Sequence, residues 1–392
     1  MCKRKKILIF NGYYVPAKKY GGPLTSCKNV VKTCSDEFEF YIVARNHDVG
    51  SKAVFPNLHE GWKLVEGAMV KYIAADELNY DKAALRSLLE EIKPDLIWFA
   101  GILVPGIKLK TIELGREMRI PILLSPRGEV SHDRIKIKAW KKKPYLFLTK
   151  LLGFYRETYY HATSNDEVVG LKKYVDAPEN RIFLVPNIAV PLESLRSEYH
   201  KKQGELRVVF IARIQMVKNI KFAVQAVCKM KSKVQFDIYG PLEQPEYLKE
   251  CMEIAKTAPR NVTISYCGEL DPTVVGKCFR KYDCFLFPTI NENYGHSIAE
   301  ALANGVPVIL SKDTTPWNAI NDKAGFVCSL NDINDFTCAL EKIAAFNNEE
   351  YHELQLKVQE FYKEISAKDN AIEGHKIMFN SIIDDYCKRN RV

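Results

Sequence analysis

The segment Cys284-Phe-Leu-Phe-Pro-Thr-Ile-Asn-Glu-Asn-Tyr-Gly-His-Ser-Ile-Ala-Glu-Ala-Leu-Ala-Asn-Gly-Val-Pro-Val-Ile-Leu-Ser311 contains the pattern that decides the fold. Its apolar run Cys284–Phe287 is typical of a buried strand. Ile298 to Asn304 has the composition of a helix, which Gly305 and the proline two residues later terminate. Because Val306–Leu310 is a second apolar run, the segment predicts a strand, a loop, a helix and another strand.

A carboxylate stands at each end of the junction between this loop and this helix. Glu292 lies in the loop, and Glu300 projects from the first turns of the helix. The residues between them lie at the helix N-terminus, where free backbone N–H groups and the dipole attract an anion: Asn293, Tyr294, Gly295, His296 and Ser297. Either glutamate alone would be an ordinary first-turn carboxylate. Together they indicate a ligand that is anionic in the middle and polyhydroxylated at both ends, such as a nucleotide-sugar.

The segment resembles the Glu-x7-Glu signature of retaining glycosyltransferases of the GT-B fold, family 4, also called the group 1 transferases. The likeness includes both glutamates and the surrounding Asn-Tyr-Gly-His-Ser and Asn-Gly-Val-Pro-Val-Ile strings. It implies that Glu292 contacts the donor sugar and its phosphates and that Glu300 binds the ribose hydroxyls. The amides of residues 293 to 297 would then hold the pyrophosphate.

Length and composition indicate a protein of two domains. A chain of 392 residues is long for one compact domain, and its 47% hydrophobic and 27% charged residues are those of a globular protein. The net charge of +9 suits phosphates, an anionic membrane surface or nucleic acid as partners. The 11 scattered cysteines and the short apolar run Ile7–Phe10 argue against a disulfide scaffold, a signal peptide or a transmembrane span. We therefore expect a cytoplasmic protein.

Apolar runs alternate with helical periodicity in both halves of the chain, which predicts an α/β protein with two Rossmann-like domains and parallel sheets. The strands expected in the first half are Ile7–Phe10, Phe38–Ala44, Leu96–Ala100 and Ile122–Ser125, with a helix over Asp81–Ile92. Those expected in the second half are Val208–Ala212, Val234–Tyr239, Val262–Tyr266, Cys284–Phe287, Val306–Leu310 and Phe326–Cys328.

The expected domain boundary lies between Pro186 and Gly204, a stretch without a clear apolar period. We expect an N-terminal acceptor-binding domain over residues 1–190 and a nucleotide-sugar-binding domain over residues 205–368. By resemblance, a helix over residues 369–392 crosses back to the first domain. Ligands of parallel sheets bind at the carboxyl ends of the strands, so the two sheets are expected to face each other across a cleft.

Two cations follow the first strand of the second half. Arg213 stands at the end of the strand, and Lys218 precedes a helix that Asn219 could cap. By spacing alone they would be solvated residues of a surface turn. The resemblance implies that both contact donor phosphates and stabilise the departing nucleoside diphosphate. Because the chain has no Asp-x-Asp triplet for Mg²⁺ or Mn²⁺, we expect no catalytic metal and no cofactor.

Three further strings follow expected strands. Gly21 and Gly22 form a pair that suits close approach to a phosphate or an ordinary turn, and the resemblance favours a substrate-binding loop. The string Ser-Pro-Arg127-Gly resembles a family string that faces the donor sugar. Whether Arg127 contacts the sugar, the phosphate or the acceptor stays open. Other family members have a histidine here, and His132 could take its place or be an ordinary surface residue. The backbone near Gly268, Glu269 and Leu270 would contact the base. Trp317 could belong to the core or line the sugar pocket.

The run Arg134–Lys150 combines several basic residues with Trp, Tyr, Phe and Leu and contains no acid. This composition suits contact with anionic lipid as well as a solvated basic helix face. Nucleic acid is a third reading, but no recognised nucleic-acid module accompanies the run, so we expect none as a partner.

Taken together, the resemblance implies a retaining, metal-independent hexosyltransferase. It would move a sugar from a nucleotide-sugar, UDP rather than GDP, to a glycan or lipid-linked glycan, in the synthesis of a bacterial surface polysaccharide such as O-antigen or capsule. Front-face attack needs no protein nucleophile, so Glu292 would orient and stabilise. A nucleotide-sugar epimerase on the same fold and a non-catalytic membrane-surface binding protein are the alternatives. A glycogen-type phosphorylase would need a pyridoxal-phosphate lysine site, which we do not find.

Overall fold

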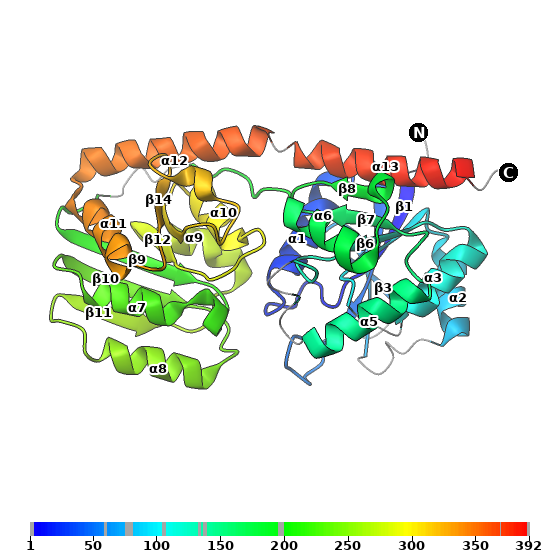
Figure 1. The fold of residues 1–392 in the computed structure, drawn as a ribbon, viewed down its shortest axis with the longest axis horizontal. Helices are drawn as coiled ribbons and strands as arrows, with labels where there is room; N and C mark the ends of the chain where they lie inside the picture. The colour runs from blue at the N-terminus through cyan, green and yellow to red at the C-terminus, as the bar shows by residue number, and fades with distance from the viewer. Residues whose placement is uncertain are drawn as a thin grey trace. The chain divides into compact units, whose positions relative to one another are not determined.

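The structure is a computed structural model that describes residues 4–58, 61–74, 81–103, 107–131, 135, 139–194, 200–368 and 370–389. The chain divides into two compact units. Unit 1 comprises Met1–Ile188 together with Asn370–Val392, and unit 2 comprises Ala189–Asp369. Each unit has its own sheet and its own apolar core (Figure 1).

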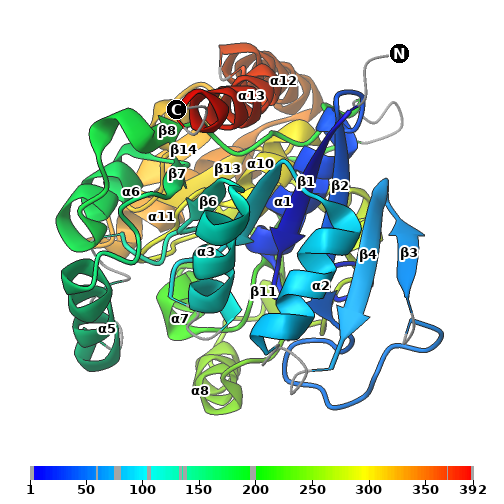
Figure 2. The ribbon, with the colours of Figure 1, turned by 90° about the vertical axis from the view of Figure 1, so that its right-hand side faces the viewer.

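Unit 1 contains, over its described residues, an eight-stranded sheet of order β3-β4-β2-β1-β5-β6-β7-β8. Its strands are β1 (Lys5–Phe10), β2 (Phe38–Arg45), β3 (Trp62–Val65), β4 (Ala68–Ile73), β5 (Leu96–Ala100), β6 (Ile122–Ser125), β7 (Tyr159–Ala162) and β8 (Ile182–Leu184). Its helices include α1 (Gly22–Cys34), α2 (Lys82–Ile92), α3 (Ile107–Met118), α5 (Ala139–Leu151), α6 (Asn165–Gly170) and α13 (Ala371–Arg389). Only β3 and β4 pair antiparallel among these strands, at one edge of the sheet (Figure 2).

The four strands expected in the first half are confirmed, and so is the helix that begins after Asp81. The Asp81 carboxylate accepts a hydrogen bond of 2.7 Å from the amide of Ala84, as an N-cap residue does. The sequence analysis missed β3, β4 and β7 as members of the sheet. A two-residue turn with positive φ at Glu66 and Gly67 joins β3 to β4.

The C-terminal helix α13 packs on unit 1. Met378, Phe379 and Ile382 of this helix are buried in the same core cluster as β1 and β2. The ring of Phe379 meets that of Phe38 edge to face, with 5.4 Å between the centroids. Tyr159 of β7 donates a hydrogen bond of 2.6 Å to the Asp385 carboxylate.

Unit 2 contains, over the part of the chain that is described, a six-stranded parallel sheet of order β11-β10-β9-β12-β13-β14. The strands are β9 (Glu205–Ile211), β10 (Lys233–Tyr239), β11 (Val262–Tyr266), β12 (Cys284–Phe287), β13 (Val308–Ser311) and β14 (Gly325–Cys328). Helices α7 (Ile220–Cys228), α8 (Pro245–Ala255), α9 (Val275–Phe279), α10 (His296–Ala303), α11 (Ile333–Ala345) and α12 (Asn348–Lys368) accompany it. All six strands expected in this half are confirmed, within three residues at their ends. None of the described helices has the length and apolar composition needed to cross a membrane.

Two buried histidines join α13 to the sheet of unit 1. His161 of β7 bonds through Nε2 to the carbonyl of Val185 at 2.9 Å, and its Nδ1 lies 3.1 Å from the hydroxyl of Ser125. The ring of His375 packs edge-on against that of His161, with 4.9 Å between the centroids. Burial lowers the pKa of His161 well below its usual range and lowers that of His375 to about 4. Both side chains are therefore neutral in the folded protein at pH 7.

We predict that acid destabilises unit 1 through these histidines. Because their pKa values are lower in the folded chain than in the unfolded chain, the unfolded state binds more protons as the pH falls. The free energy of unfolding has its full value above about pH 6.5. It should fall by roughly 2 kcal/mol per histidine between pH 7 and pH 5. Urea unfolding at the two pH values measures this loss.

In the same experiment, His375→Phe should reduce the pH dependence, since a phenyl ring fits among the aromatic neighbours and cannot be protonated. The exposed His352, changed to Gln, is the matched control. An unchanged pH dependence in His375→Phe would contradict this account.

Candidate active site

The loops at the carboxyl edge of the unit 2 sheet are tied together by hydrogen bonds. The amide of Ile290, after β12, donates to the carbonyl of Val217, after β9, at 2.9 Å. The buried hydroxyl of Thr289 donates to the same carbonyl at 3.0 Å. Ligands of parallel sheets bind at this edge. The two loops therefore form one supported surface where a ligand is expected.

Lys218 and Glu292 form a buried ion pair on this surface. Their side chains are 5% and 17% exposed, so the charges attract each other more strongly than at a solvated surface. The ammonium also lies 5.3 Å from the ring centroid of Phe287, and the amide of Glu292 donates to the carbonyl of Thr314 at 2.8 Å. The structure thus brings together two residues predicted to bind substrate, 74 positions apart in the chain.

Arg213 stands at the end of β9, as expected, and is paired with a residue that the sequence analysis missed. Its Nη1 lies 3.0 Å from Oε1 of Glu243, which also accepts a hydrogen bond from Gln215. The two charged side chains are about one-third exposed, so Arg213 is accessible to a ligand. The signal for Glu243 was its position after β10, two residues beyond Tyr239-Gly-Pro241.

The expected cap at Asn219 is wrong. Asn219 precedes α7 but has left-handed backbone angles, with φ 57°, and its side chain makes no capping hydrogen bond within the described residues. Its amide instead donates to the carbonyl of Met216 and closes a short 3₁₀ turn over Met216–Lys218. The tight turn fixes the backbone of Lys218 next to the helix start.

The N-terminus of α10 begins at Gly295 and carries no side-chain cap among the described residues. Gly295 has φ 79°, and a Cβ there would lie 2.6 Å from Cδ1 of Ile298 and 3.3 Å from Cγ of Glu292. Only glycine therefore fits this position. The Nε1 of Trp317 donates to the carbonyl of Tyr294, and their ring centroids are 5.7 Å apart. Trp317 is buried and thus belongs to the core that supports the loop.

Glu300, on α10, is partly buried, and no described residue donates a hydrogen bond to its carboxylate. Burial raises the pKa of Glu300 to about 7, because removal from water disfavours the ionised form. Tyr362 of α12 is close enough to be affected by its charge. A half-ionised carboxylate with unused acceptor positions is suited to binding hydroxyl groups.

The loop after β11 lies at the same edge of the sheet. The amide of Gly240, after β10, donates to the carbonyl of Gly268 at 2.9 Å, and Tyr266 donates to the Gly240 carbonyl at 2.9 Å. Gly268 has φ 82°, Glu269 is exposed, and Leu270 packs against the unit 2 core.

The other predicted substrate-binding residues belong to unit 1. Gly21 is the N-cap of α1, with φ 71°, and Gly22 is the first helical residue. Arg127 follows β6 with φ 50°, and its Nη1 donates to Oδ1 of Asn187 at 2.7 Å. His132 and residues 134 and 136–138 of the basic run lie outside the described residues. Ser164 caps the N-terminus of α6, where its side chain accepts a hydrogen bond from the amide of Glu167.

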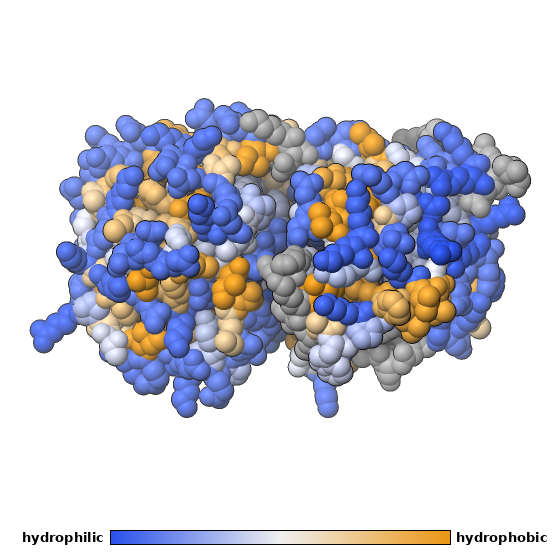
Figure 3. Space-filling view, in the orientation of Figure 1, coloured by the Kyte–Doolittle hydropathy of each residue, from blue (hydrophilic) through white to orange (hydrophobic). Residues whose placement is uncertain are grey.

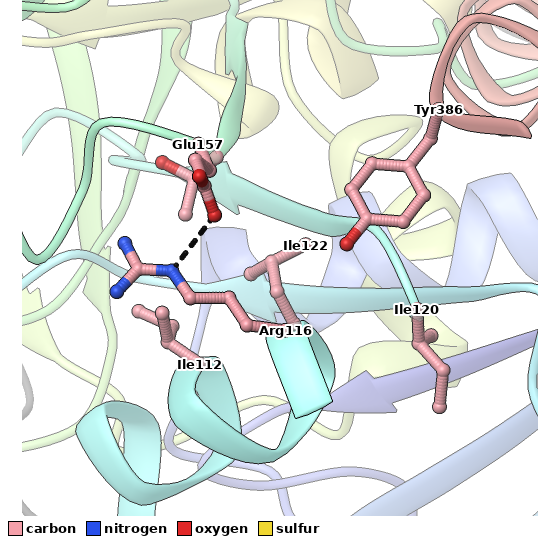
Figure 4. A pocket seen from close by; sticks show the side chains of 7 residues that line it. Ile112, Arg116, Ile120, Ile122, Glu157 and Tyr386 are labelled. Carbon is pink, nitrogen blue, oxygen red and sulfur yellow. Dashed lines mark ion pairs between the residues drawn. The ribbon is translucent and has the colours of Figure 1, made fainter. Parts of the chain in front are cut away.

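A small hollow on unit 1 lies away from these residues (Figure 4). It is lined by Ile112, Arg116, Ile120, Ile122, Glu157, Thr158 and Tyr386. Ile122 begins β6 and Thr158 precedes β7, so the hollow is at the amino edge of the sheet, opposite to Arg127. Arg116 is already paired there with Glu157, with 3.0 Å between Nε and Oε2. Within the described part of the chain, no group of three His, Cys, Asp or Glu side chains is arranged to hold a metal.

A family model matches the part of the chain that contains this site. Residues 193–360 match the family model "Glycosyl transferases group 1". This match contains Arg213, Lys218, Glu292 and Glu300. A search of curated proteins gives no match.

Several solved structures have the same fold. Sucrose-phosphate synthase from Thermosynechococcus elongatus superposes with a TM-score of 0.68 at 15% identity, over 96% of this chain and 100% of the other. Anabaena HepE, solved in complex with UDP and glucose, gives 0.69 at 13% identity, over 98% and 100%. WaaG, a glycosyltransferase involved in lipopolysaccharide biosynthesis, gives 0.62 at 11% identity, over 93% and 99%. Residues 193–360 thus match the glycosyl transferases group 1 model, and the chain as a whole has the GT-B fold of these solved structures.

Proposed function

We propose that the protein is a retaining, metal-independent glycosyltransferase that uses a UDP-sugar and a glycan or lipid-linked glycan acceptor. The buried Lys218–Glu292 pair beside the N-terminus of α10 carries this proposal. Lys218, Arg213 and the amides of residues 293 to 297 would hold the pyrophosphate, and Glu300 the ribose hydroxyls. The backbone of Gly268, Glu269 and Leu270 would contact the base. Positive groups placed where the diphosphate departs stabilise the transition state without a metal.

In the proposed reaction, Glu292 lies beside the sugar and forms no covalent bond with it. The acceptor oxygen bonds to the anomeric carbon on the face from which the diphosphate oxygen departs. The acceptor proton passes to that diphosphate oxygen, so the atoms balance without a protein nucleophile. Glu292, held by Lys218, would orient the sugar hydroxyls. Binding of the diphosphate gives Lys218 a second anionic partner.

Two solved relatives support the choice of substrates. HepE was solved with UDP and glucose, which favours a uridine nucleotide and a hexosyl group for this chain. WaaG is involved in lipopolysaccharide biosynthesis, which favours an acceptor for a bacterial surface polysaccharide. An epimerase would act on the same donor without an acceptor. The release of nucleoside diphosphate, as opposed to isomerisation of the sugar, distinguishes the two activities.

We predict that Glu292→Gln and Lys218→Met each reduce the transfer rate by about 10²–10³-fold, because each removes a group aimed at charge in the transition state. The release of UDP from UDP-sugars measures this. Removing one partner leaves a buried charge unpaired, so each single variant should also lose roughly 3 kcal/mol of stability. The double variant restores neutrality and should fold, yet remain inactive.

The exposed ion pair Lys256–Glu253 of unit 2, with 2.7 Å between its charged atoms, gives the matched control. Lys256→Met should leave turnover unchanged. Near-normal turnover in the Lys218–Glu292 double variant would refute the assigned site.

A second prediction concerns Glu300 and pH. If its carboxylate accepts hydrogen bonds from ribose, binding requires the ionised form, whose fraction rises through the pKa of about 7. The affinity for UDP-glucose should therefore increase about tenfold from pH 6 to pH 8. Calorimetric titration measures it, and Glu300→Gln should give weaker, pH-independent binding. The same pH dependence in Glu300→Gln would exclude Glu300 as its source.

We also propose that α5 contacts an anionic membrane. Trp140, Phe147, Leu148 and Leu151 recur at helical spacing and are 52–73% exposed. Lysines flank this apolar stripe, and α5 contains no acidic residue. Figure 3 shows orange apolar surface where Figure 1 draws one end of α5. Exposed apolar and basic side chains on one helix suit the interface of a bilayer that contains a lipid-linked acceptor.

We predict that the protein sediments with vesicles containing anionic lipid, and less with neutral ones. Leu151→Ser should weaken this binding about tenfold, because an inserted apolar side chain is lost. Leu64→Ser is the matched control, since Leu64 on β3 is 75% exposed and lies outside α5. Equal binding of both variants, or no binding of wild type, would instead favour a solvated basic helix.

A further inference from the structure

Unit 1 contains buried polar groups that lack partners. Asn11, directly after β1, is 2% exposed, and neither atom of its side-chain amide has a hydrogen-bond partner among the described residues. The same holds for Nε and Nη2 of Arg127, directly after β6. Buried polar atoms in native proteins are nearly always paired, so these four atoms have hydrogen-bonding capacity for a water or a ligand.

Asn11 and Arg127 belong to one cluster. The thiol of Cys27, on α1, interacts with the side chain of Asn11 and is affected by the charge of Arg127. Tyr20, just before Gly21, is affected by the same guanidinium and the same thiol. Asn11 follows β1 and Arg127 follows β6, so both lie at the carboxyl edge of the unit 1 sheet, where parallel-sheet proteins bind ligands.

The guanidinium of Arg127 is held in a fixed orientation. Its Nη1 donates to Oδ1 of Asn187, which also accepts a hydrogen bond of 2.8 Å from Ser26. The guanidinium carbon lies 5.5 Å from the ring centroid of Trp98. With Nη1 engaged, Nε and Nη2 remain, and these two N–H groups point in the same direction. They form the side-on fork with which arginine binds a phosphate or carboxylate through two parallel hydrogen bonds.

The charge of Arg127 also lacks a direct counter-ion. Glu167 is near enough to act on Arg127, but its carboxylate accepts hydrogen bonds from Gly128 and Thr163 instead. No ion pair joins the two residues in the described chain. Burial consequently lowers the pKa of Arg127. A buried water could pair with the N–H groups, but only an anion would offset the cost of the buried charge.

We propose that unit 1 has an oxyanion subsite in which the Nε–Nη2 edge of Arg127 and the amide of Asn11 bind a phosphate group of a substrate. The identity of that substrate rests on the proposed function: the phosphate belongs either to the donor pyrophosphate or to a phosphorylated acceptor. The binding of the oxyanion itself does not depend on transferase activity.

Inorganic phosphate is the probe for the subsite. Lys218→Met provides the background, because it weakens the phosphate site proposed on unit 2. In this background, phosphate at constant ionic strength should raise the melting temperature, and adding Arg127→Met should weaken phosphate binding at least tenfold. Without phosphate, Arg127→Met should be as stable as its parent or more so, since it removes an unpaired buried charge.

Arg116→Met is the matched control, because Arg116 is paired with Glu157 at the opposite edge of the same sheet. Should Arg127→Met fail to fold, Arg127→Lys keeps the charge without the fork and should still bind phosphate more weakly. Asn11→Ala should have the same effect as a second, independent variant. Undiminished phosphate binding in the Arg127 and Asn11 variants, or none in their parent, would overturn the proposal.

Kinetics identifies the source of the phosphate. If the donor supplies it, Arg127→Met weakens UDP binding and slows UDP-sugar hydrolysis without acceptor. If the acceptor supplies it, UDP binding and hydrolysis are unchanged and KM for the acceptor rises. An Arg127-dependent phosphate effect in a protein that turns over no nucleotide-sugar would refute the proposed function and leave the subsite standing.

Discussion

The ion pair between Lys218 and Glu292 is the interaction on which the candidate site depends. Two opposite charges can be buried only where the backbone holds both in place, and the loops after β9 and β12 do this through the bonds of Ile290 and Thr289 to Val217. Gly295 then allows α10 to begin beside Glu292 without a clash. The edge of the sheet, the loops and the helix start therefore form one rigid constellation, which suits a site that must position a sugar and a diphosphate together.

Much of this constellation could be predicted from the sequence because it depends on local patterns. Apolar runs mark the six strands of unit 2, and the Glu-x7-Glu segment marks the start of α10. The pairing of Lys218 with Glu292, and of Arg213 with Glu243, could not be predicted, because it depends on which loops the fold makes neighbours. The side-chain cap expected at Asn219 is not formed, because this residue has left-handed backbone angles and not the extended ones typical of a capping residue.

Unit 1 was predicted less completely for related reasons. The β3–β4 hairpin has weak apolar alternation, and its pairing depends on a turn at Glu66 and Gly67. The contact between His161 and His375 joins residues far apart in the chain, so no local sequence pattern predicts it. Arg127 was singled out by resemblance alone. The structure adds a physical reason to expect ligand binding: Nη1 of Arg127 is held by Asn187, and its Nε and Nη2 have no hydrogen-bond partner among the described residues.

The most direct measurement for the proposed donor site is a crystal structure of the protein with an intact UDP-sugar. We expect the pyrophosphate oxygens within about 3 Å of Lys218 Nζ and of amides at the start of α10. Glu292 should lie against the sugar hydroxyls and Glu300 against the ribose. A nucleotide bound elsewhere, with Lys218 and Glu292 still paired only to each other, would contradict the account.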